Sequence, residues 1–169
     1  MRGHGLGMLI NMEKEAASPF LKYQELLYRI AFSNMKNQAD AEDVVQEAFC
    51  RYLKAKPVLA DDAHEKNWFI RVVINICYDL QKSVWFSRTV GFDAVPECEM
   101  KHFHLPYVQE DETLWQVMEL PAAYRNPLYL FYYEDYSIRE IAKIMGLEEG
   151  TVKTRLRRGR QMLKEKLEK

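Results

Sequence analysis

Hydrophobic residues recur through most of this chain at intervals of three and four positions, which is the spacing of one face of an α-helix. Before residue 84 this pattern predicts three helices, over residues 19–36, 40–56 and 63–83. Asp40 can cap the second helix, and Pro57 should end it because the residue before a proline avoids the helical conformation. The chain also has only seven glycines. We therefore expect an all-α fold.

The last third of the chain has the pattern of two short helices joined by a tight turn. Ser137 and Glu140 form the pair of a capping box, so the first helix should begin there. Gly146 can adopt the left-handed conformation that ends a helix, and a second helix should start near Glu149. The apolar positions expected to face the core are Ile138, Ile141, Ala142 and Met145 in the first helix, and Val152, Leu156 and Leu163 in the second.

The outward side of this last helix concentrates positive charge. From Thr151 to Lys164 it has six Lys and Arg residues and no acid, in a protein with a formal net charge of −1. A cationic helix after a tight turn is typical of DNA binding. A lone charge run is more often a solvated face, but the capped helix, the glycine turn and the absence of acids favour DNA. The residues placed to reach a groove are Lys153, Thr154, Arg157 and Arg158.

Charge and proline content divide the chain into domains. Residues 92–119 contain seven acids against a single lysine, and two prolines interrupt them. We interpret residues 89–110 as a flexible acidic linker between two small helical domains, 18–88 and 111–169. Residues 1–17 are expected to be a disordered leader that is too short in apolar residues for a secretory signal, with Met12 as an alternative start.

Other classes of protein are disfavoured. The three cysteines, Cys50, Cys77 and Cys98, are far apart, which favours a reduced, cytoplasmic setting. No apolar run approaches the roughly 20 residues of a membrane span. Cys98 with His102 and His104 is a weak metal pattern, so no metal and no cofactor are expected. No catalytic triad, glycine-rich phosphate loop or HExxH motif is present, so we do not expect an enzyme.

Two of the early helices carry polar faces. The second presents acids and an amide at Glu42, Asp43, Gln46 and Glu47. Acids in a first helical turn can simply complement the helix dipole, and spacing alone favours that interpretation. The third has an expected core stripe and an outward set with amides, cations and an aromatic ring that could bind unpaired bases, although core packing is the usual role of tryptophan. The stripe is Phe69, Val72, Val73, Ile76 and Leu80, and the outward set is Asn67, Trp68, Arg71, Asn75 and Lys82.

The order of these segments resembles a known family. ADAEDVVQEAFCRYLKA, then NWFIRVVINICYDLQKS, then the block from LPAAYRNP to RQMLKEKL are similar to an extracytoplasmic-function sigma factor of the sigma-70 family. The resemblance covers about residues 21–83 and 112–168. Other helix-turn-helix proteins share parts of the last block, but they do not usually share the two earlier segments in this order.

The resemblance implies roles for three groups of residues. The second helix would dock on core RNA polymerase, the third would recognise and melt the minus-ten promoter element, and the last would read the minus-thirty-five element. The implied polymerase contacts are Asp43, Gln46, Glu47, Phe49 and Arg51. The implied minus-ten contacts are Asn67, Trp68, Arg71, Asn75 and Lys82. The implied minus-thirty-five contacts are Thr151, Lys153, Thr154, Arg157 and Arg158.

The chain departs from the family pattern at a few positions. The third helix ends in Asp79-Leu-Gln-Lys-Ser, where family members often have more basic residues, so minus-ten binding would either be weak or depend more on Lys82 and Arg88. Val73 and Ile74 stand where a polar or basic residue is common. Glu148 occupies the place of a Ser or Thr cap. We expect its carboxylate to accept the cap hydrogen bond, at some cost in DNA affinity because it would lie close to phosphate.

The resemblance implies a non-catalytic transcription initiation factor. Its expected partners are core RNA polymerase, promoter DNA and an anti-sigma protein, and the free protein is expected to be a monomer. The main alternative is a stand-alone helix-turn-helix regulator. Such regulators are usually dimers, and this sequence shows no obvious dimerisation helix or ligand-binding domain.

Overall fold

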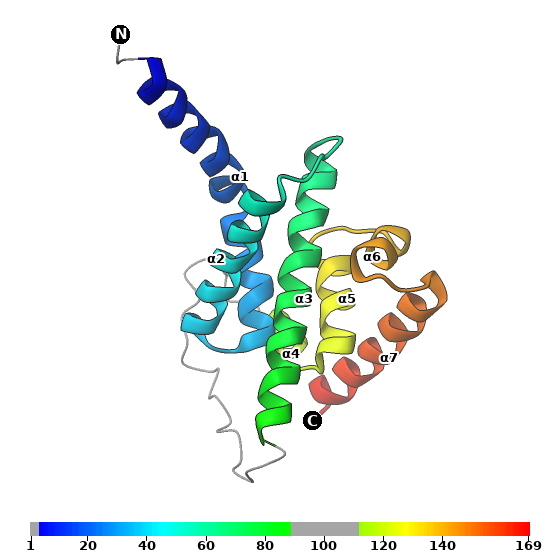
Figure 1. Ribbon diagram of the computed structural model, residues 1–169. Coiled ribbons are helices and arrows are strands. Elements are labelled where there is room, and N and C mark those ends of the chain that lie inside the picture. Colours follow the sequence, from blue (N-terminus) through cyan, green and yellow to red (C-terminus); the bar gives the residue numbers. More distant parts are fainter. Residues whose placement is uncertain (1–3, 89–111) are drawn as a thin grey trace. The chain divides into compact units, whose positions relative to one another are not determined.

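The computed structural model describes residues 4–88 and 112–169, and the side chains of residues 19–83 and 113–169. Within these ranges every regular element is a helix, which confirms the all-α prediction. The chain divides into two compact units, residues 1–86 and 87–169 (Figure 1). The first contains α1, α2 and most of α3, and the second contains α4 to α7. The predicted acidic linker, residues 89–110, lies outside the described residues.

Helix α1 spans His4–Met35, so it begins well before Pro19, where the sequence pattern placed its start. The expectation of a disordered leader over residues 1–17 is therefore wrong from His4 onward. Residues 8–17 consist largely of Met, Leu, Glu, Lys and Ala, which have high helix propensity. Figure 1 shows these first turns of α1 extending beyond α2 and α3.

Helix α2 spans Gln38–Ala55 and has caps at both ends. Its N-cap is Asn37, whose side-chain oxygen accepts a hydrogen bond from the Asp40 N–H at 3.2 Å. The prediction that Asp40 caps this helix is wrong, because Asn37 supplies the same acceptor one turn earlier. At the other end Lys56 adopts a left-handed conformation with φ 43°, and the helix ends before Pro57 as predicted.

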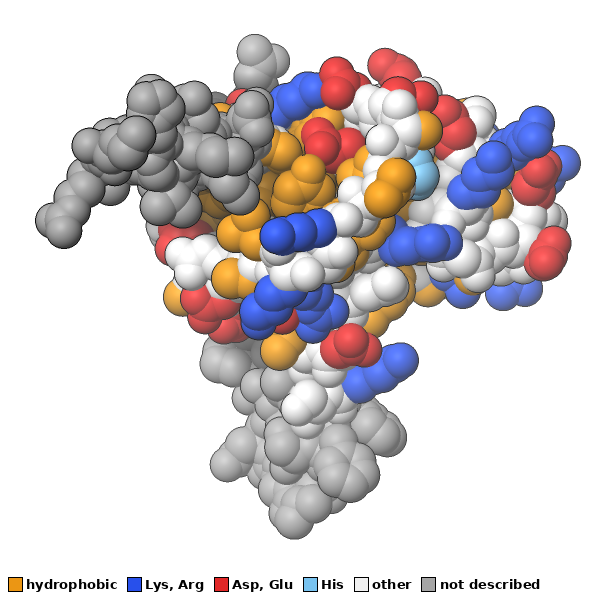
Figure 2. Space-filling model, turned by 45° about the horizontal axis from the view of Figure 1, so that its top comes forward, with side chains coloured by type: hydrophobic (Ala, Val, Ile, Leu, Met, Phe, Trp, Pro, Cys, Tyr) orange, Lys and Arg blue, Asp and Glu red, His pale blue; other side chains and the backbone are white. Residues whose placement is uncertain are grey.

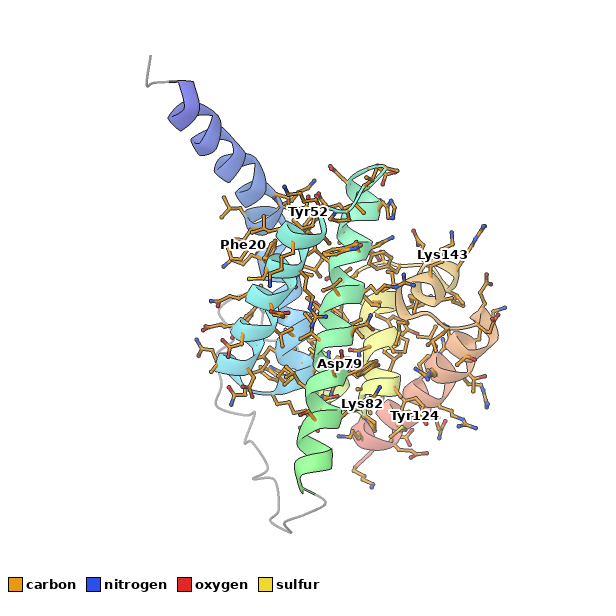
Figure 3. All side chains as sticks on the ribbon, viewed as in Figure 1. Phe20, Tyr52, Asp79, Lys82, Tyr124 and Lys143 are labelled. Atoms are coloured by element: carbon orange, nitrogen blue, oxygen red, sulfur yellow. The ribbon has the colours of Figure 1, made fainter. Side chains whose placement is uncertain are left out.

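An aromatic cluster forms one end of the core of the first unit. Phe49 of α2 lies between Phe20 and Phe69, with ring centroids 4.4 and 4.7 Å away. Tyr52 stacks on Phe69 at 4.8 Å, and Phe20 and Tyr52 occupy the same end of the unit (Figure 3). Because each ring contacts rings from other helices, this cluster fixes how α1, α2 and α3 pack together.

Helix α3 spans Asp62–Arg88, and its buried face is broader than the predicted stripe. Phe69, Val73 and Ile76 are buried as predicted, whereas Leu80 is 39% exposed. The core also takes in Ile70, Ile74 and Cys77, which lie to one side of that stripe. The stripe was misplaced because α3 contacts both other helices: Phe69 meets α1 and α2 rings, and Gln81 donates to the Asn34 carbonyl on α1.

In the second unit, α4 spans Glu112–Met118, α5 Ala122–Tyr132, α6 Ile138–Met145 and α7 Glu149–Leu167. Arg125 is 3% exposed, and its guanidinium donates to the carbonyls of Met118 and Leu120. These bonds satisfy the carbonyls that end α4, so they fix the turn into α5.

Helices α5 and α7 cross closely at Gly159. A Cβ added there would lie 2.6 Å from Leu128 Cδ1, 3.2 Å from Leu128 Cγ and 3.3 Å from Tyr124 Cβ. Tyr124 lies on α5 beside α7 (Figure 3), and Leu128 is 1% exposed. Because the neighbouring side chain is buried, it has little room to move aside.

Replacing Gly159 with alanine should therefore destabilise the second unit by about 1–3 kcal/mol, the usual result of overpacking. Gly150→Ala is the matched control, since it adds the same methyl group to the same helix where nothing lies within 4 Å. We expect Gly150→Ala to be neutral or stabilising by up to about 1 kcal/mol. Urea unfolding followed by circular dichroism measures both; equal stabilities for the two variants would contradict the close crossing.

Candidate nucleic-acid interface

Both ends of α6 have the hydrogen bonds that the sequence predicts. Ser137 Oγ accepts from the Glu140 N–H at 3.3 Å, and Glu140 Oε2 accepts from the Ser137 N–H at 2.8 Å, which completes the capping box. Gly146 has φ 64°, and the Leu147 N–H bonds to the Ala142 carbonyl at 2.9 Å. The left-handed Gly146 and the Leu147 bond set the direction in which the chain leaves α6 toward α7.

Helix α7 buries one narrow side and exposes the other. Val152, Leu156 and Gly159 are buried, whereas the predicted core residue Leu163 is only partly buried. Figure 2 shows Lys and Arg side chains projecting over α6 and α7, with several acids among them. The structure brings all five predicted DNA contacts to the exposed side: Thr151, Lys153, Thr154, Arg157 and Arg158.

The N-terminus of α7 lacks the side-chain cap that we expected from Glu148. Glu148 is the N-cap by backbone conformation, with φ −72° and ψ 145°, but its carboxylate accepts no cap hydrogen bond. Glutamate is not among the preferred N-cap residues, which have a shorter side chain that can turn back to the first turn. The first intrahelical bond comes from the Val152 N–H. The earlier amides of α7 therefore receive no bond from the cap side chain.

The predicted minus-ten residues share one side of α3. At roughly 100° per residue, they fall within an arc of about 100°. Arg71, Asn75 and Lys82 are exposed or partly exposed. Trp68 is half-buried, with its ring 5.6 Å from Tyr52 and 5.2 Å from Phe69, so only part of it is accessible. Asn67 lies at the edge of this face.

Two details of this α3 face bear on its chemistry. The Asn67 side-chain oxygen is enclosed and has no hydrogen-bond partner among the described residues. Asp79 is exposed one turn after Asn75 and lies near Lys82 on the same helix (Figure 3). A carboxylate therefore accompanies Lys82 on this face of α3. The side chain of Arg88, the other cation expected to compensate, lies outside the described side chains.

The polar face of α2 is exposed, but not all of its predicted residues belong to it. Asp43, Gln46 and Glu47 are exposed. Arg51 bonds to Glu47, with Nε 2.8 Å from Oε1, and this hydrogen bond lowers the pKa of the Glu47 carboxyl. Phe49 is 7% exposed and packs in the aromatic cluster. Little of the Phe49 ring is therefore left for a partner, and its role as a polymerase contact remains a prediction.

Three exposed residues near the polar faces of α2 and α7 were not identified from the sequence. Leu53 is 49% exposed and lies two turns after Gln46 on the outward side of α2. Arg139 and Lys143 are exposed one turn apart on α6. The sequence could have indicated this, because the two cations have i, i+4 spacing and fall on the side of α6 opposite its apolar residues. They extend the basic surface of α7 onto α6.

Among the described residues, no group of three or more His, Cys, Asp or Glu side chains could hold a metal ion. The weak pattern of Cys98, His102 and His104 lies outside the described residues. In the same part of the chain, no helix is long and apolar enough to cross a membrane.

Comparison with known proteins identifies the two units. The family Sigma-70 region 2 matches residues 20–86, and Sigma-70, region 4 matches residues 116–163. The RNA polymerase sigma factor SigV of Bacillus subtilis is 30% identical over 151 residues, which cover 87% of each chain. The chain belongs to the sigma-70 family of RNA polymerase sigma factors.

Other relatives agree with this family. The ECF RNA polymerase sigma factor SigM of Bacillus subtilis is 31% identical and covers 84% of this chain and 88% of its own. SigW of the same species is 26% identical over 86% of this chain and 84% of its own. The sigma factor RpoE of Bartonella quintana, solved with the anti-sigma factor NepR, is 21% identical, with a TM-score of 0.71 over 94% of this chain and 97% of that one. That likeness shows that the fold is shared.

Sigma regions 2 and 4 contain the exposed faces of α2, α3 and α7. Region 2 of this sigma factor includes the exposed faces of α2 and α3, and region 4 includes the turn between α6 and α7 together with the exposed side of α7. The positions of the contact residues within these regions remain a prediction, since likeness in fold does not identify individual contacts.

The capping box of α6 gives a test that depends on pH. Hydrogen bonds from the Ser137 backbone and hydroxyl lower the pKa of Glu140 from its ordinary value of 4.5. A lowered folded-state pKa stabilises the fold above the ordinary value, and this stability is lost as the pH falls through the folded-state pKa. Glu140→Gln can still accept these bonds but does not titrate.

We therefore expect unfolding of α6 to show a weaker pH dependence below about 4.5 in Glu140→Gln than in the unchanged protein. Urea unfolding followed through the NMR signals of α6 measures this difference. Glu168→Gln, at an exposed acid near the end of α7, is the control that should keep the original profile. Identical profiles for the unchanged protein and Glu140→Gln would refute the role of the capping box.

Proposed function

We propose that this sigma factor joins core RNA polymerase, directs it to promoters with a minus-ten and a minus-thirty-five element, and assists DNA melting. The observation that carries this proposal is the presence of sigma regions 2 and 4 in one chain, each with an exposed polar face suited to its role. Two binding elements on one chain raise each other's effective concentration, so neither needs to bind DNA tightly alone.

Region 4 supplies the minus-thirty-five contacts through α7. Arg157 and Arg158 are exposed and can donate to guanine edges or to phosphates, and Lys153 can neutralise phosphate charge. The N–H groups around Thr151, which donate no bond to the Glu148 carboxylate, suit a phosphate oxygen. Lys143 and Arg139 of α6 would add phosphate contacts beside them. In this proposal, the N-terminus of α7 and the two arginines contact the same DNA groove.

Region 2 supplies the minus-ten contacts through α3. Arg71, Asn75 and Lys82 are accessible and can bind the displaced strand by hydrogen bonds and charge. Trp68 offers only part of its ring, since Tyr52 and Phe69 cover the rest. We infer that it supports an unpaired base at its edge and that the polar residues supply most of the affinity.

The exposed side of α2 is proposed to dock on core RNA polymerase. Asp43 and Gln46 present a carboxylate and an amide, and Glu47 presents its carboxylate together with the paired Arg51 guanidinium. Leu53 adds an apolar contact beside them, and an exposed apolar residue within a polar surface is common in protein interfaces.

The same proposal covers the protein's lack of catalysis, its location, its oligomeric state and its regulation. It has no catalytic role, acts in the cytoplasm where RNA polymerase works, and is a monomer when free. An anti-sigma protein is proposed as its inhibitor, as NepR is the anti-sigma factor bound to the structurally similar RpoE. A stand-alone helix-turn-helix regulator is the alternative, but it would not explain the region 2 match over residues 20–86.

Transcription by purified core RNA polymerase plus the full chain tests the function and the role of α7 together. We expect initiation at a mapped promoter, and we expect Arg157→Ala/Arg158→Ala to lower it at least about tenfold, since each lost base or phosphate contact weakens DNA binding. Lys164→Ala/Lys169→Ala removes the same charge from the end of the chain and is the control. If the unchanged protein did not stimulate initiation, the proposed sigma function would be wrong. If both double variants lost initiation equally, only the total positive charge would matter for DNA binding.

Binding to core RNA polymerase tests the proposed role of α2. We expect Asp43→Ala/Glu47→Ala to weaken binding about tenfold, because two carboxylates of the contact surface are lost. Glu165→Ala/Glu168→Ala removes two exposed acids from α7 and should leave the affinity unchanged. Fluorescence anisotropy of the labelled full chain measures both. Unchanged affinity in the α2 variant would mean that the polymerase binds elsewhere.

A further inference from the structure

The hydroxyl group of Thr154 is already engaged within α7. Its Oγ1 donates to the carbonyl oxygen of Gly150, one turn earlier, at 3.0 Å. A threonine hydroxyl has a single hydrogen, so it cannot donate to that carbonyl and to a base at the same time. The groups of Thr154 that are left for DNA are its methyl group and the lone pairs of the hydroxyl oxygen.

Thr154 also occupies the middle of the exposed side of the helix. At roughly 100° per residue, it lies about 180° from the buried residues Val152, Leu156 and Gly159. Arg157 follows one turn later on the same side. One turn earlier, Gly150 has no side chain, and the space around it is open to 4 Å. A base edge can therefore approach Thr154 without displacing a neighbouring side chain of α7.

The location of Thr154 along the helix suits contact with bases. It is in the second turn of α7, and the N-terminal residues of a recognition helix are the ones that usually meet base edges. Thymine is the one base of unmodified DNA that presents a methyl group in the major groove, and threonine methyl groups are among the side-chain groups that contact it.

We propose that Thr154 recognises thymine in the minus-thirty-five element through its methyl group, while the neighbouring arginines supply the hydrogen-bond donors. This inference rests on the proposed function, in which α7 enters the major groove. It assigns Thr154 a different chemistry from Arg157 and Arg158: an apolar contact with one base type in place of a charge that attracts any phosphate.

Two substitutions separate the methyl group from the hydroxyl group. Thr154→Val keeps a methyl group at the same branch point and removes the hydroxyl, whereas Thr154→Ser keeps the hydroxyl and removes the methyl. Both are tested as full chains with core RNA polymerase, and circular dichroism checks that helix content is unchanged. The DNA probes are a mapped promoter duplex and a series in which each thymine of the upstream element is replaced singly by uracil, which lacks only the methyl group.

With the unchanged protein, we expect uracil at one position to lower promoter affinity about fourfold, the effect of one buried methyl group. Thr154→Val should show the same sensitivity to uracil. Thr154→Ser should bind the thymine promoter about fourfold more weakly and should be insensitive to uracil at that position. This pattern would locate the contact between the two methyl groups, because removing either one should abolish the effect of removing the other.

Several results would overturn the proposal. One is uracil having no effect at any position with the unchanged protein; another is Thr154→Val losing affinity while Thr154→Ser does not, which would mean that the hydroxyl oxygen accepts from a base. In either case, Arg157→Ala/Arg158→Ala shows which idea has failed. If that variant still loses initiation, the proposed function stands and only the Thr154 contact is wrong. If it does not, α7 itself does not read the element.

Discussion

The close crossing of α5 and α7 at Gly159 is the constraint on which the orientation of the exposed side of α7, the proposed DNA surface, depends. Helix α7 has few buried residues for its length, and Val152, Leu156 and Gly159 are the ones that orient it. A larger residue at position 159 would collide with Leu128 and Tyr124. Helix α7 would then have to move away from α5 or rotate about its own axis. Thr154, Arg157 and Arg158 lie on the side of α7 opposite these buried residues. The packing of the buried side against α5 therefore sets the direction in which they point.

The same helix shows how capping and recognition compete for the same positions. The capping box of Ser137 and Glu140 fixes the start of α6, whereas the start of α7 has no side-chain cap. A fully capped α7 would satisfy amides that a phosphate could otherwise bind. The helix end without a side-chain cap is therefore the one at the proposed DNA surface, and the well-capped α6 lies beside it.

Local sequence patterns predicted features whose causes are local. The capping box, the left-handed Gly146 and the exposed side of α7 were all predictable, because a hydrogen bond between neighbours or a helical period decides each of them. The errors came where neighbours were missed or competed. Asn37, three residues before Asp40, captured the role of N-cap, and the helix-forming residues before Pro19 extended α1 beyond its expected start.

The order of residues was enough to predict that the chain is helical and where its last two helices turn, since these follow from periodicity and short-range contacts. The family resemblance rests instead on the order of three characteristic segments. Packing between helices was needed to show that Phe49 fills an aromatic cluster and that Leu80 is exposed. The folded helices also showed that Glu47 pairs with Arg51 and that the Thr154 hydroxyl is engaged with Gly150. Whether a side chain is free for a partner depends on the neighbours that already hold it, and residue spacing does not specify those neighbours.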